Sequence, residues 1–519
     1  MAPTPSAHPD KTMPHQRKAH SAEIELKLSL PGATARDIGA QLAATPPLMG
    51  LPVVVQRLRN IYFDTPGQQL RQHKVALRLR SQREGGGRLR WLQTLKTAGQ
   101  GEAGLSARGE WEVALRKGVI DALALQGTPW PQIDPDGSLL RQLLPCFTTE
   151  CTRTLREYTA PDGSLVEVAL DVGSVRAGAQ REPLCELELE LKRGSAQALF
   201  ALAAQLAEHL PVLPAPQSKA ERGWRLLDGT SHAPRRARQP TLAARTPLPQ
   251  AAQAVLAEAF GQLVENLGGI LHSDGPELVH QARVGWRRWR SALWLFKPLL
   301  ANIAPAPDST ALRPVLTALG ALRDLDVAAL ESLPCWSGAY VAGHEDRAAH
   351  WQAMEAAVAT ERRRRRQQLL AALRQPATGQ VLLTLAQWLY TLPDTRWPRE
   401  LARQGIAHWA LRRTRRLHRR LREALAELEK VEPAGGDPFE QQHSVRLLAK
   451  RTRYVLEALR TVLPRERTRR WQDRATDLQT RIGAARDLML LAELLAPLGV
   501  HPGILGFVRG VAAAHGADH

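Results

Sequence analysis

Cysteine is scarce in this chain, with four residues among 519, and their positions exclude two kinds of site. Cys146, Cys151, Cys185 and Cys335 form no C-x-x-C pair, and their spacings fit neither a disulfide framework nor a zinc site. We therefore expect buried thiols in a reducing compartment. The chain also lacks any uninterrupted run of about 18 apolar residues, so we expect no membrane-spanning helix and a cytoplasmic protein.

Several signatures of nucleotide binding and hydrolysis are absent as well. The sequence contains no G-x-x-x-x-G-K-[ST] loop, no dinucleotide-binding glycine fingerprint, no H-E-x-x-H and no G-x-S-x-G. These absences exclude a P-loop NTPase and a serine hydrolase of the common kind.

Acidic residues are too few to balance the basic ones. The chain has 70 Lys and Arg against 51 Asp and Glu, which leaves a formal charge of +19. Residues 1–230 carry 28 basic and 24 acidic side chains, whereas residues 231–519 carry 42 and 27. Nearly all of those 42 are arginines, whose planar guanidinium pairs with phosphate oxygens two at a time. The second half therefore predicts a polyanionic partner.

The first half of the chain shows the alternation of strands. Polar and apolar residues alternate over 23–30, 75–80, 88–96, 108–113, 164–172 and 185–192, with breaks rich in Gly or Pro between them. Many short strands at regular spacing predict an antiparallel sheet or barrel. Helical segments are expected at 33–45, 138–146 and 195–210, and the first 20 residues are expected to be a disordered tail.

The second half has the composition of helices. Residues 229–248 form a predicted linker, rich in Pro, Arg and small residues. Beyond it, segments of Ala, Leu, Arg and Glu predict a helical bundle or a pair of them, at 249–272, 276–300, 309–332, 345–375, 379–391, 398–429, 438–463 and 465–496.

This helical half contains an internal duplication. HQARVGWRRWR begins at His280 and HSVRLLAKRTR at His443, and the same offset relates Arg323-Asp324-Leu325 to Arg486-Asp487-Leu488. One spacing preserved over this length indicates a repeated unit. We place the two repeats at about 249–400 and 401–519. An ion pair that clamps the bundle is the expected role of the two aspartates.

The basic residues of each copy share one face of a helix, since positions 0, 3, 7 and 10 fall within about 80° of one another. The first stripe is His280, Arg283, Arg287 and Arg290, and the second stripe is His443, Arg446, Lys450 and Arg453. Carboxylates that would neutralise them at the i,i+4 spacing are missing. An external anion therefore explains these stripes better than a solvated helix face does.

Carboxylates and cations at every second position mark the faces of the expected strands. The acidic ones are Glu23 and Glu25; Glu110 and Glu112; Glu167 and Asp171; and Glu186, Glu188 and Glu190. The basic ones are Arg78, Arg80, Arg88, Arg90 and Lys96, with Lys219 and Arg222 later in the chain. If the sheet closes with these faces inward, its lumen contains both signs of charge. That composition suits Mg²⁺ beside a chain of phosphates.

Eight motifs follow one another along the first half, namely E-x-E-x-K at 23–27, NIYFDTPGQQL at 60–70, ALRLR at 76–80, TLK at 94–96, RGEWE at 108–112, ALD at 169–171, CELELEL at 185–191 and SKAERG at 218–223. Together they resemble those of the CYTH family, the triphosphate tunnel enzymes. The two repeats resemble the CHAD domain. The order of the two units is similar to that of bacterial inorganic triphosphatases.

The resemblance implies an α+β multidomain protein. Residues 21–228 would form an eight-stranded antiparallel tunnel with flanking helices, and residues 249–519 would form duplicated four-helix bundles. The resemblance also implies the site residues. Catalytic contacts would come from Lys27, Arg78, Arg80 and Lys96. Mg²⁺ or Mn²⁺ would be bound by Glu23, Glu25, Glu110, Glu112, Asp171, Glu188 and Glu190, and which of Glu186, Glu188 and Glu190 are ligands is left open. Phosphate would be held by Arg57 or Arg59, Arg153, Lys219 and Arg222.

The resulting functional prediction is hydrolysis of inorganic tripolyphosphate in the tunnel, with inorganic polyphosphate bound to both stripes of the helical half and access to polyphosphate granules. Other substrates stay open, namely a nucleotide, thiamine triphosphate, an RNA 5′ end or ATP for cyclisation. A polyphosphate-binding scaffold with an idle barrel is a second alternative. Nucleic acid on the basic half is a third, which we disfavour because Trp289 and Trp294 lie off the first stripe and suit core packing.

Overall fold

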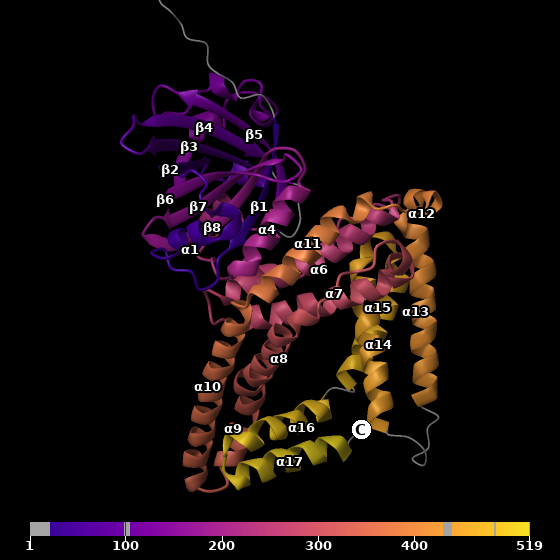
Figure 1. Cartoon of the computed structure of the whole chain (residues 1–519). Helices are drawn as coiled ribbons and strands as arrows, with labels where there is room; N and C mark the ends of the chain where they lie inside the picture. Colours follow the sequence, from indigo (N-terminus) through magenta and orange to yellow (C-terminus); the bar gives the residue numbers. More distant parts are fainter. Residues whose placement is uncertain (1–20, 98, 100–103, 429–437, 482–483, 518–519) are drawn as a thin grey trace, which may run out of the picture.

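The protein is described by a computed structural model that covers residues 21–97, 99, 104–428, 438–481 and 484–517 (Figure 1). The predicted tail at residues 1–20 lies outside this range. The strands are β1 (Ser21–Ser29), β2 (Val54–Asp64), β3 (Val75–Glu84), β4 (Arg90–Thr97), β5 (Leu105–Leu115), β6 (Leu144–Thr159), β7 (Leu165–Ala177), β8 (Gln180–Arg193) and β9 (Leu213–Pro214).

The helices of the first half are short apart from α4. They are α1 (Ile38–Ala44), α2 (Gln69–Gln72), α3 (Trp130–Ile133), α4 (Gln197–His209) and α5 (Lys219–Leu227). The second half contains α6 (Leu248–Ile270), α7 (Pro276–Ile303), α8 (Arg313–Val327), α9 (Leu333–Val341), α10 (Asp346–Leu373), α11 (Pro376–Thr391), α12 (Arg399–Arg403), α13 (Ile406–Leu428), α14 (Pro438–Ala458), α15 (Arg465–Arg481), α16 (Ala484–Leu495) and α17 (Pro502–Ala517).

The first eight strands form a closed antiparallel barrel, as predicted. The strand order is β5-β4-β3-β2-β6-β7-β8-β1, and a further pairing of β1 with β5 closes the sheet; β9 is added beside β1. In the closing pair Glu23 lies opposite Arg108, and on the other side of β1 Lys27 lies opposite Glu188. Closure therefore places β1, which carries the E-x-E-x-K motif, between β5 and β8.

Both faces of β1 are buried, one in the lumen of the barrel and the other in an apolar core outside it. Glu25 and Lys27 point into the barrel, whereas Leu26 and Leu28 are fully buried on its outer side. These leucines belong to an apolar core that also contains Phe200 of α4. The period of two in EIELKLSL thus separates a polar lumen from an apolar outer layer.

One helical prediction in this half is wrong. The segment 138–146 contains only a short 3-10 turn at Leu140–Gln142, and β6 begins at Leu144. A residue that precedes proline disfavours the helical conformation, and Pro145 follows Leu144 directly. The segment pairs with β2 instead, with Asp64 opposite Leu144. Neither β2 nor β6 is among the segments with predicted alternation, and only the eight-stranded tunnel implied by the resemblance accounts for them.

The helical half packs directly against the barrel. Helices α6, α7, α11, α13 and α14 share one apolar core with α4 and the outer side of β1 and β8 (Figure 1). Phe200 of α4 lies 5.8 Å from Tyr390 of α11, measured between ring centroids. A Cβ atom on Gly379 of α11 would come within 2.1 Å of the Val212 carbonyl oxygen. The two domains are therefore in van der Waals contact over an apolar surface.

A second core joins the ends of the two predicted repeats. Leu325, Trp351 and Met354 of α8 and α10 are buried together with Leu491 of α16 and Ile504 of α17. The repeats are thus interleaved, while the boundary near residue 400 stays a prediction. None of the described helices is both long and apolar enough to cross a bilayer.

Candidate functional site

A cavity of about 1490 Å³ runs through the barrel, and all eight strands contribute polar side chains to it. Among those lining it are Glu23, Glu25, Lys27, Asn60, Tyr62, Arg78, Arg80, Lys96, Arg108, Glu110, Glu112, Arg153, Asp171, Glu188, Glu190 and Lys192. The lumen contains both signs of charge, as the alternation predicted. We call the charged side chains of this set the ion-pair network.

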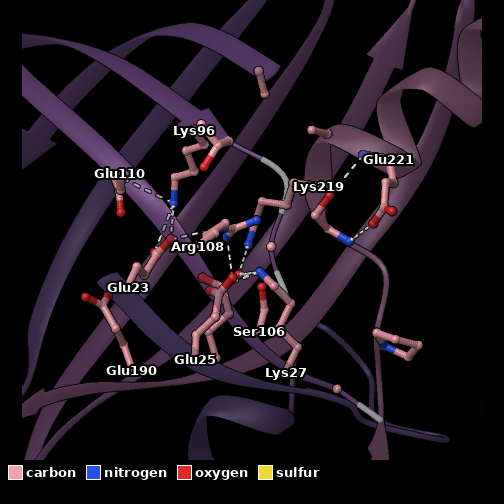
Figure 2. Close-up of a pocket in the computed structure, with 18 of the residues that line it drawn as sticks. Glu23, Glu25, Lys27, Lys96, Ser106, Arg108, Glu110, Glu190, Lys219 and Glu221 are labelled. Carbon is pink, nitrogen blue, oxygen red and sulfur yellow. Dashed lines mark hydrogen bonds and ion pairs between the residues drawn. The ribbon is translucent and has the colours of Figure 1, made fainter. Parts of the chain in front are cut away.

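One end of the network joins β1, β4 and β5. Lys96 donates to both oxygens of Glu23, at 2.9 and 2.7 Å, and lies 3.1 Å from Glu110. Arg108 bridges the two carboxylates of the E-x-E motif, with its Nε 2.9 Å from Glu23 and its Nη2 donating to Glu25. Figure 2 shows these side chains converging. Each acidic residue therefore has a cation in contact.

The centre of the network joins β1, β6, β7 and β8. Lys27 donates to Glu188 and lies 3.2 Å from Glu25. Arg153 makes a two-point ion pair with Asp171, at 2.8 and 2.6 Å, and its Nη2 also donates to Glu188 at 2.6 Å. Glu188 thus receives hydrogen bonds from cations of two strands.

Lys219 enters the network from outside the sheet. It is the first residue of α5, whose start is fixed by a capping box between Ser218 and Glu221. Its ammonium lies 2.7 Å from Asp171 and 2.9 Å from Glu188, and it also donates to Glu186. The SKAERG motif therefore places the buried Lys219 beside the carboxylates of β7 and β8.

The β3 arginines are less tightly paired. Arg78 lies 3.5 Å from Glu110, and Arg80 lies 4.0 Å from Glu112. Arg80 also donates to the Asn60 side-chain oxygen at 2.9 Å. Burial lowers the pKa of Arg80, and the neighbouring Arg78 lowers it further. An anion between these guanidiniums would relieve that repulsion.

Opposing effects act on the buried carboxylates. Burial alone would raise the pKa of Glu23, but the Lys96 ammonium and the Arg108 guanidinium hold it well below the ordinary value. In the same way, burial would raise the pKa of Asp171, while Arg153 and Lys219 lower it to about 2. Both groups are therefore ionised at neutral pH, which ligands of a hard cation must be.

The acidic residues offer the oxygen donors that Mg²⁺ or Mn²⁺ would need. Carboxylate oxygens of Asp171, Glu186 and Glu188 lie within 4.8 Å of one another, in a buried cluster. Lys219 donates to this cluster, so its negative charge is already partly balanced. The residues fit a divalent cation by their chemistry, provided that lysine and arginine give up some of their carboxylate contacts.

Most of the predicted tunnel residues come together, and three do not. Arg57 and Arg59 are exposed on the outer face of β2, where Arg59 lies 3.2 Å from Glu150. Alternation along β2 explains this correction, because Asn60 and Tyr62 occupy the inward positions. Arg222 lies outside the cavity lining and donates to Glu182 at 2.8 Å.

Sequence reasoning missed several lumen residues. Arg108 shares the face of Glu110 and Glu112 in the RGEWE motif, so the same alternation could have identified it. Asn60 and Tyr62 lie in the NIYF motif with equally clear alternation. Lys192 continues the face of Glu188 and Glu190, and it lies 2.7 Å from Glu190. The cysteine prediction also needs correction, because Cys335 is exposed and only Cys151 is fully buried.

The first stripe lies along α7 as predicted, with unequal exposure. Arg287 and Arg290 are exposed, whereas Arg283 donates to Asp324 of α8 at 2.9 Å. This ion pair fits the expected clamp between helices. Burial lowers the pKa of His280, and Arg323 lowers it further, so this histidine adds little positive charge at neutral pH.

The second stripe lies on α14, and part of it is outside the described side chains. His443 falls in this part, and Arg486 and Asp487, which belong to the second repeat but not to the stripe, also lie outside the described side chains. Arg446, Lys450 and Arg453 are half-buried. Helix α14 contacts α7, and the Trp294 ring of α7 lies 5.9 Å from the Arg451 guanidinium. The two motif helices are therefore neighbours.

The first half of the chain is thus a closed barrel with a charged lumen, and the second half is a basic helical domain that contains the two sequence repeats. Comparison with known families agrees, since a CYTH domain matches residues 21–224 and a CHAD domain matches residues 254–496. The chain therefore carries a CYTH domain that is followed by a CHAD domain.

Individual relatives cover parts of the chain. The inorganic triphosphatase of Haemophilus influenzae is 32% identical over 212 residues, which cover 39% of this chain and 54% of that protein. The match thus spans about half of the relative's length. The CHAD domain from the plant Ricinus communis is 27% identical, covers 56% of this chain and 93% of that structure, and gives a TM-score of 0.46. A putative adenylyl cyclase from Hippeastrum, described as having a dominant triphosphatase activity, is 19% identical with a TM-score of 0.27, over 39% of this chain and 95% of that one.

Proposed function

We propose that residues 21–228 hydrolyse inorganic tripolyphosphate to diphosphate and phosphate. One observation carries this proposal, namely the crowding of Lys27, Arg78, Arg80, Lys96 and Arg153 into one barrel lumen together with ionised carboxylates. The similarity to an inorganic triphosphatase supports it. A polyanion could replace the carboxylates as partner of these cations, which would free the carboxylates for other ligands.

The cations would bind and align the phosphate chain. Arg78 and Arg80, the least tightly paired of these cations, would donate hydrogen bonds to phosphate oxygens first. Lys27, Lys96 and Arg153 would bind the remaining phosphate oxygens. The chain is then oriented for in-line attack of water on a terminal phosphorus, which breaks the bond to the bridging oxygen and releases diphosphate. Positioning and charge stabilisation are the protein's main contributions to such a reaction.

Mg²⁺ or Mn²⁺ would be held by Glu23 and Glu25, with further ligands from Glu110, Glu112, Asp171, Glu188 and Glu190. When bound, a divalent cation supplies charge neutralisation on phosphate oxygens and a more acidic attacking water. Lys219, which lies beside Asp171 and Glu186 and lowers the pKa of Asp171, would also contact a phosphate group.

The test is a phosphate-release panel with purified full-length protein. Tripolyphosphate, long polyphosphate, ATP and thiamine triphosphate are compared with Mg²⁺, with Mn²⁺ and with a chelator. We expect the highest kcat/KM for tripolyphosphate and loss of turnover in the chelator. A higher kcat/KM for ATP or thiamine triphosphate would assign the tunnel to that substrate, and phosphate binding without any turnover would favour the scaffold alternative.

We further propose that the helical domain binds inorganic polyphosphate, in a cytoplasmic protein with access to polyphosphate granules. The exposed Arg287 and Arg290 on α7, and the contact of α7 with α14, support this second role. A flexible polyanion that touches both stripes gains by effective concentration. Competition between polyphosphate and RNA for the full-length protein tests it. Stronger competition by RNA would overturn the assignment.

A further inference from the structure

The tunnel cavity continues past the barrel at one end, where the helical domain forms part of its wall. Residues 235–241, which we call the strap, line the cavity through Arg235, Arg238 and Gln239. Helix α6 lines it as well, through Glu258, Gly261 and Glu265 among others. This mouth of the cavity is therefore built by both domains.

The strap is fixed on α6 by one arginine. Arg235 forms ion pairs with Glu258 and Glu265, which lie on one face of the helix. Between them is Gly261, where a Cβ atom would come within 2.4 Å of an Arg235 guanidinium nitrogen. The missing side chain at Gly261 therefore makes the slot in which Arg235 lies.

Two further helices hold the strap. Arg288 of α7 is buried and donates to the Arg238 carbonyl oxygen at 3.2 Å, and Gln239 donates to the Glu457 carbonyl oxygen of α14 at 2.7 Å. The Arg238 backbone N–H also donates to Glu258 at 2.7 Å. The predicted linker is thus anchored to α6, α7 and α14, and its position at the mouth is set by these contacts.

The barrel contributes the opposite side of this mouth. Arg71 of α2 lies 2.7 Å from Asp228, just after α5, and Arg225 of α5 lies 3.4 Å from Glu265 of α6. The loop that contains α2 ends at Lys74, and Asp64 accepts hydrogen bonds from the Leu70 and Arg71 backbone N–H groups, each at 2.9 Å. These contacts place the Lys74 end of the barrel beside α6.

Two cations at the mouth differ from those inside the tunnel. Lys74 and Arg238 both line the cavity and are exposed. Their side chains make no hydrogen bond or ion pair within the described part of the chain, whereas Lys27, Lys96, Arg108, Arg153 and Lys219 all have carboxylate partners. The cavity volume also exceeds the range of roughly 300–1,000 Å³ that is typical of small-molecule pockets. A tripolyphosphate ion would leave space toward the mouth.

We propose that Lys74 and Arg238 form an outer phosphate subsite, shared by the two domains, for phosphate groups of chains longer than tripolyphosphate. This inference rests on the proposed function only in taking a phosphate chain as the tunnel's ligand. Arg235 acts as a positioning residue, because it fixes the strap and hence Arg238. The subsite makes the affinity for linear pentaphosphate higher than that for tripolyphosphate.

The test measures chain-length preference by calorimetry. Full-length protein is titrated with tripolyphosphate and with linear pentaphosphate in a chelator, so that hydrolysis does not interfere. We expect the wild type to bind pentaphosphate about tenfold more tightly, the gain typical of one added charge-assisted contact. Lys74→Gln and Arg238→Gln should each remove most of this preference. Gly261→Ala, which pushes Arg235 out of its slot, should reduce it too.

Arg236→Gln is the matched control, because Arg236 is exposed on the strap and does not line the cavity. It should leave the preference for pentaphosphate unchanged. Equal affinities of the wild type for both chains, or a preference that survives in both Lys74→Gln and Arg238→Gln, would overturn the subsite. Turnover of tripolyphosphate with Mg²⁺ is measured separately, so a failure of the proposed reaction can be told apart from a failure of the subsite.

Discussion

Lys96 and Glu23 form an ion pair on the lumen face of the barrel that spans β5, the strand between β4 and β1. The lysine contacts both oxygens of the carboxylate, and Arg108 contacts it as well. The barrel closure is therefore stabilised by charges that the proposed reaction also uses. Substitutions in this network should affect both turnover and stability, and matched outer-face variants can separate the two effects.

Glu23→Gln should lower tripolyphosphate turnover by about 10²–10³-fold, the loss typical for removal of one electrostatic contact in an active site. It should also lower the melting temperature, because Lys96 and Arg108 lose a charged partner. Phosphate release and thermal unfolding are measured on the same preparation. Glu150→Gln, on the exposed side of β6, is the control and should change neither.

Arg153→Ala should abolish measurable turnover and destabilise the barrel by about 3–5 kcal/mol, because Asp171 and Glu188 would be left with less compensation in a buried site. Arg59→Ala is the comparison, since Arg59 is on the outer face of the neighbouring β2. Its turnover should stay within about twofold of the wild type, as expected for an exposed pair. A large loss of turnover in Arg59→Ala would show that Arg59 contacts the substrate, and would contradict its placement on the outer face.

Acid should destabilise the protein through the buried carboxylates. The pKa of Asp171 is lowered from 3.8 to about 2, and the pKa of Glu23 is lowered too. A depressed carboxyl pKa contributes stability above the unfolded value, and this is lost as pH falls through the folded value. Denaturant unfolding should therefore show little change between pH 7 and pH 5 and a steep loss from about pH 4 toward pH 2. In Asp171→Asn the loss in this window should be smaller.

The cavity thiol should be inert. Burial and the neighbouring Asp171 carboxylate together raise the pKa of Cys151 to about 12. Because the thiolate is the reactive form, iodoacetamide at pH 8 should leave Cys151 unmodified while it alkylates the exposed Cys335. Mass spectrometry of peptides from the folded protein gives both extents. Equal labelling of the two would contradict the burial of Cys151.

Charge reversal on α7 tests the first stripe. Arg287→Glu with Arg290→Glu should weaken long-chain polyphosphate binding by at least about tenfold and flatten its salt dependence. Tripolyphosphate turnover by the barrel should be unaffected. The control is Arg313→Glu with Arg399→Glu, which reverses two exposed arginines outside the stripe. Equal affinity of the two double variants would show that the stripe has no special role.

The barrel and its inward face could be predicted because a period of two fixes which side chains share a face. The inward orientation of Glu23, Glu25 and Lys27 follows from this period alone. Arg57 and Arg59 were misplaced because the family resemblance supplied them, whereas the alternation that places Asn60 and Tyr62 inward puts both arginines on the outer face of β2. The pairing of Lys219 with Asp171 and Glu186 depends on α5 folding back over the barrel, and no local pattern reports such a long-range contact.

The interleaved core of the helical domain has a consequence for the order of events during synthesis. Helices α8 and α10 leave the ribosome long before α16 and α17, yet their apolar faces are covered by those last helices. During translation Leu325, Trp351 and Met354 stay exposed, or are covered by a chaperone, until α16 and α17 have been synthesised. A premature stop before Leu491 would therefore damage the first repeat as well as the second.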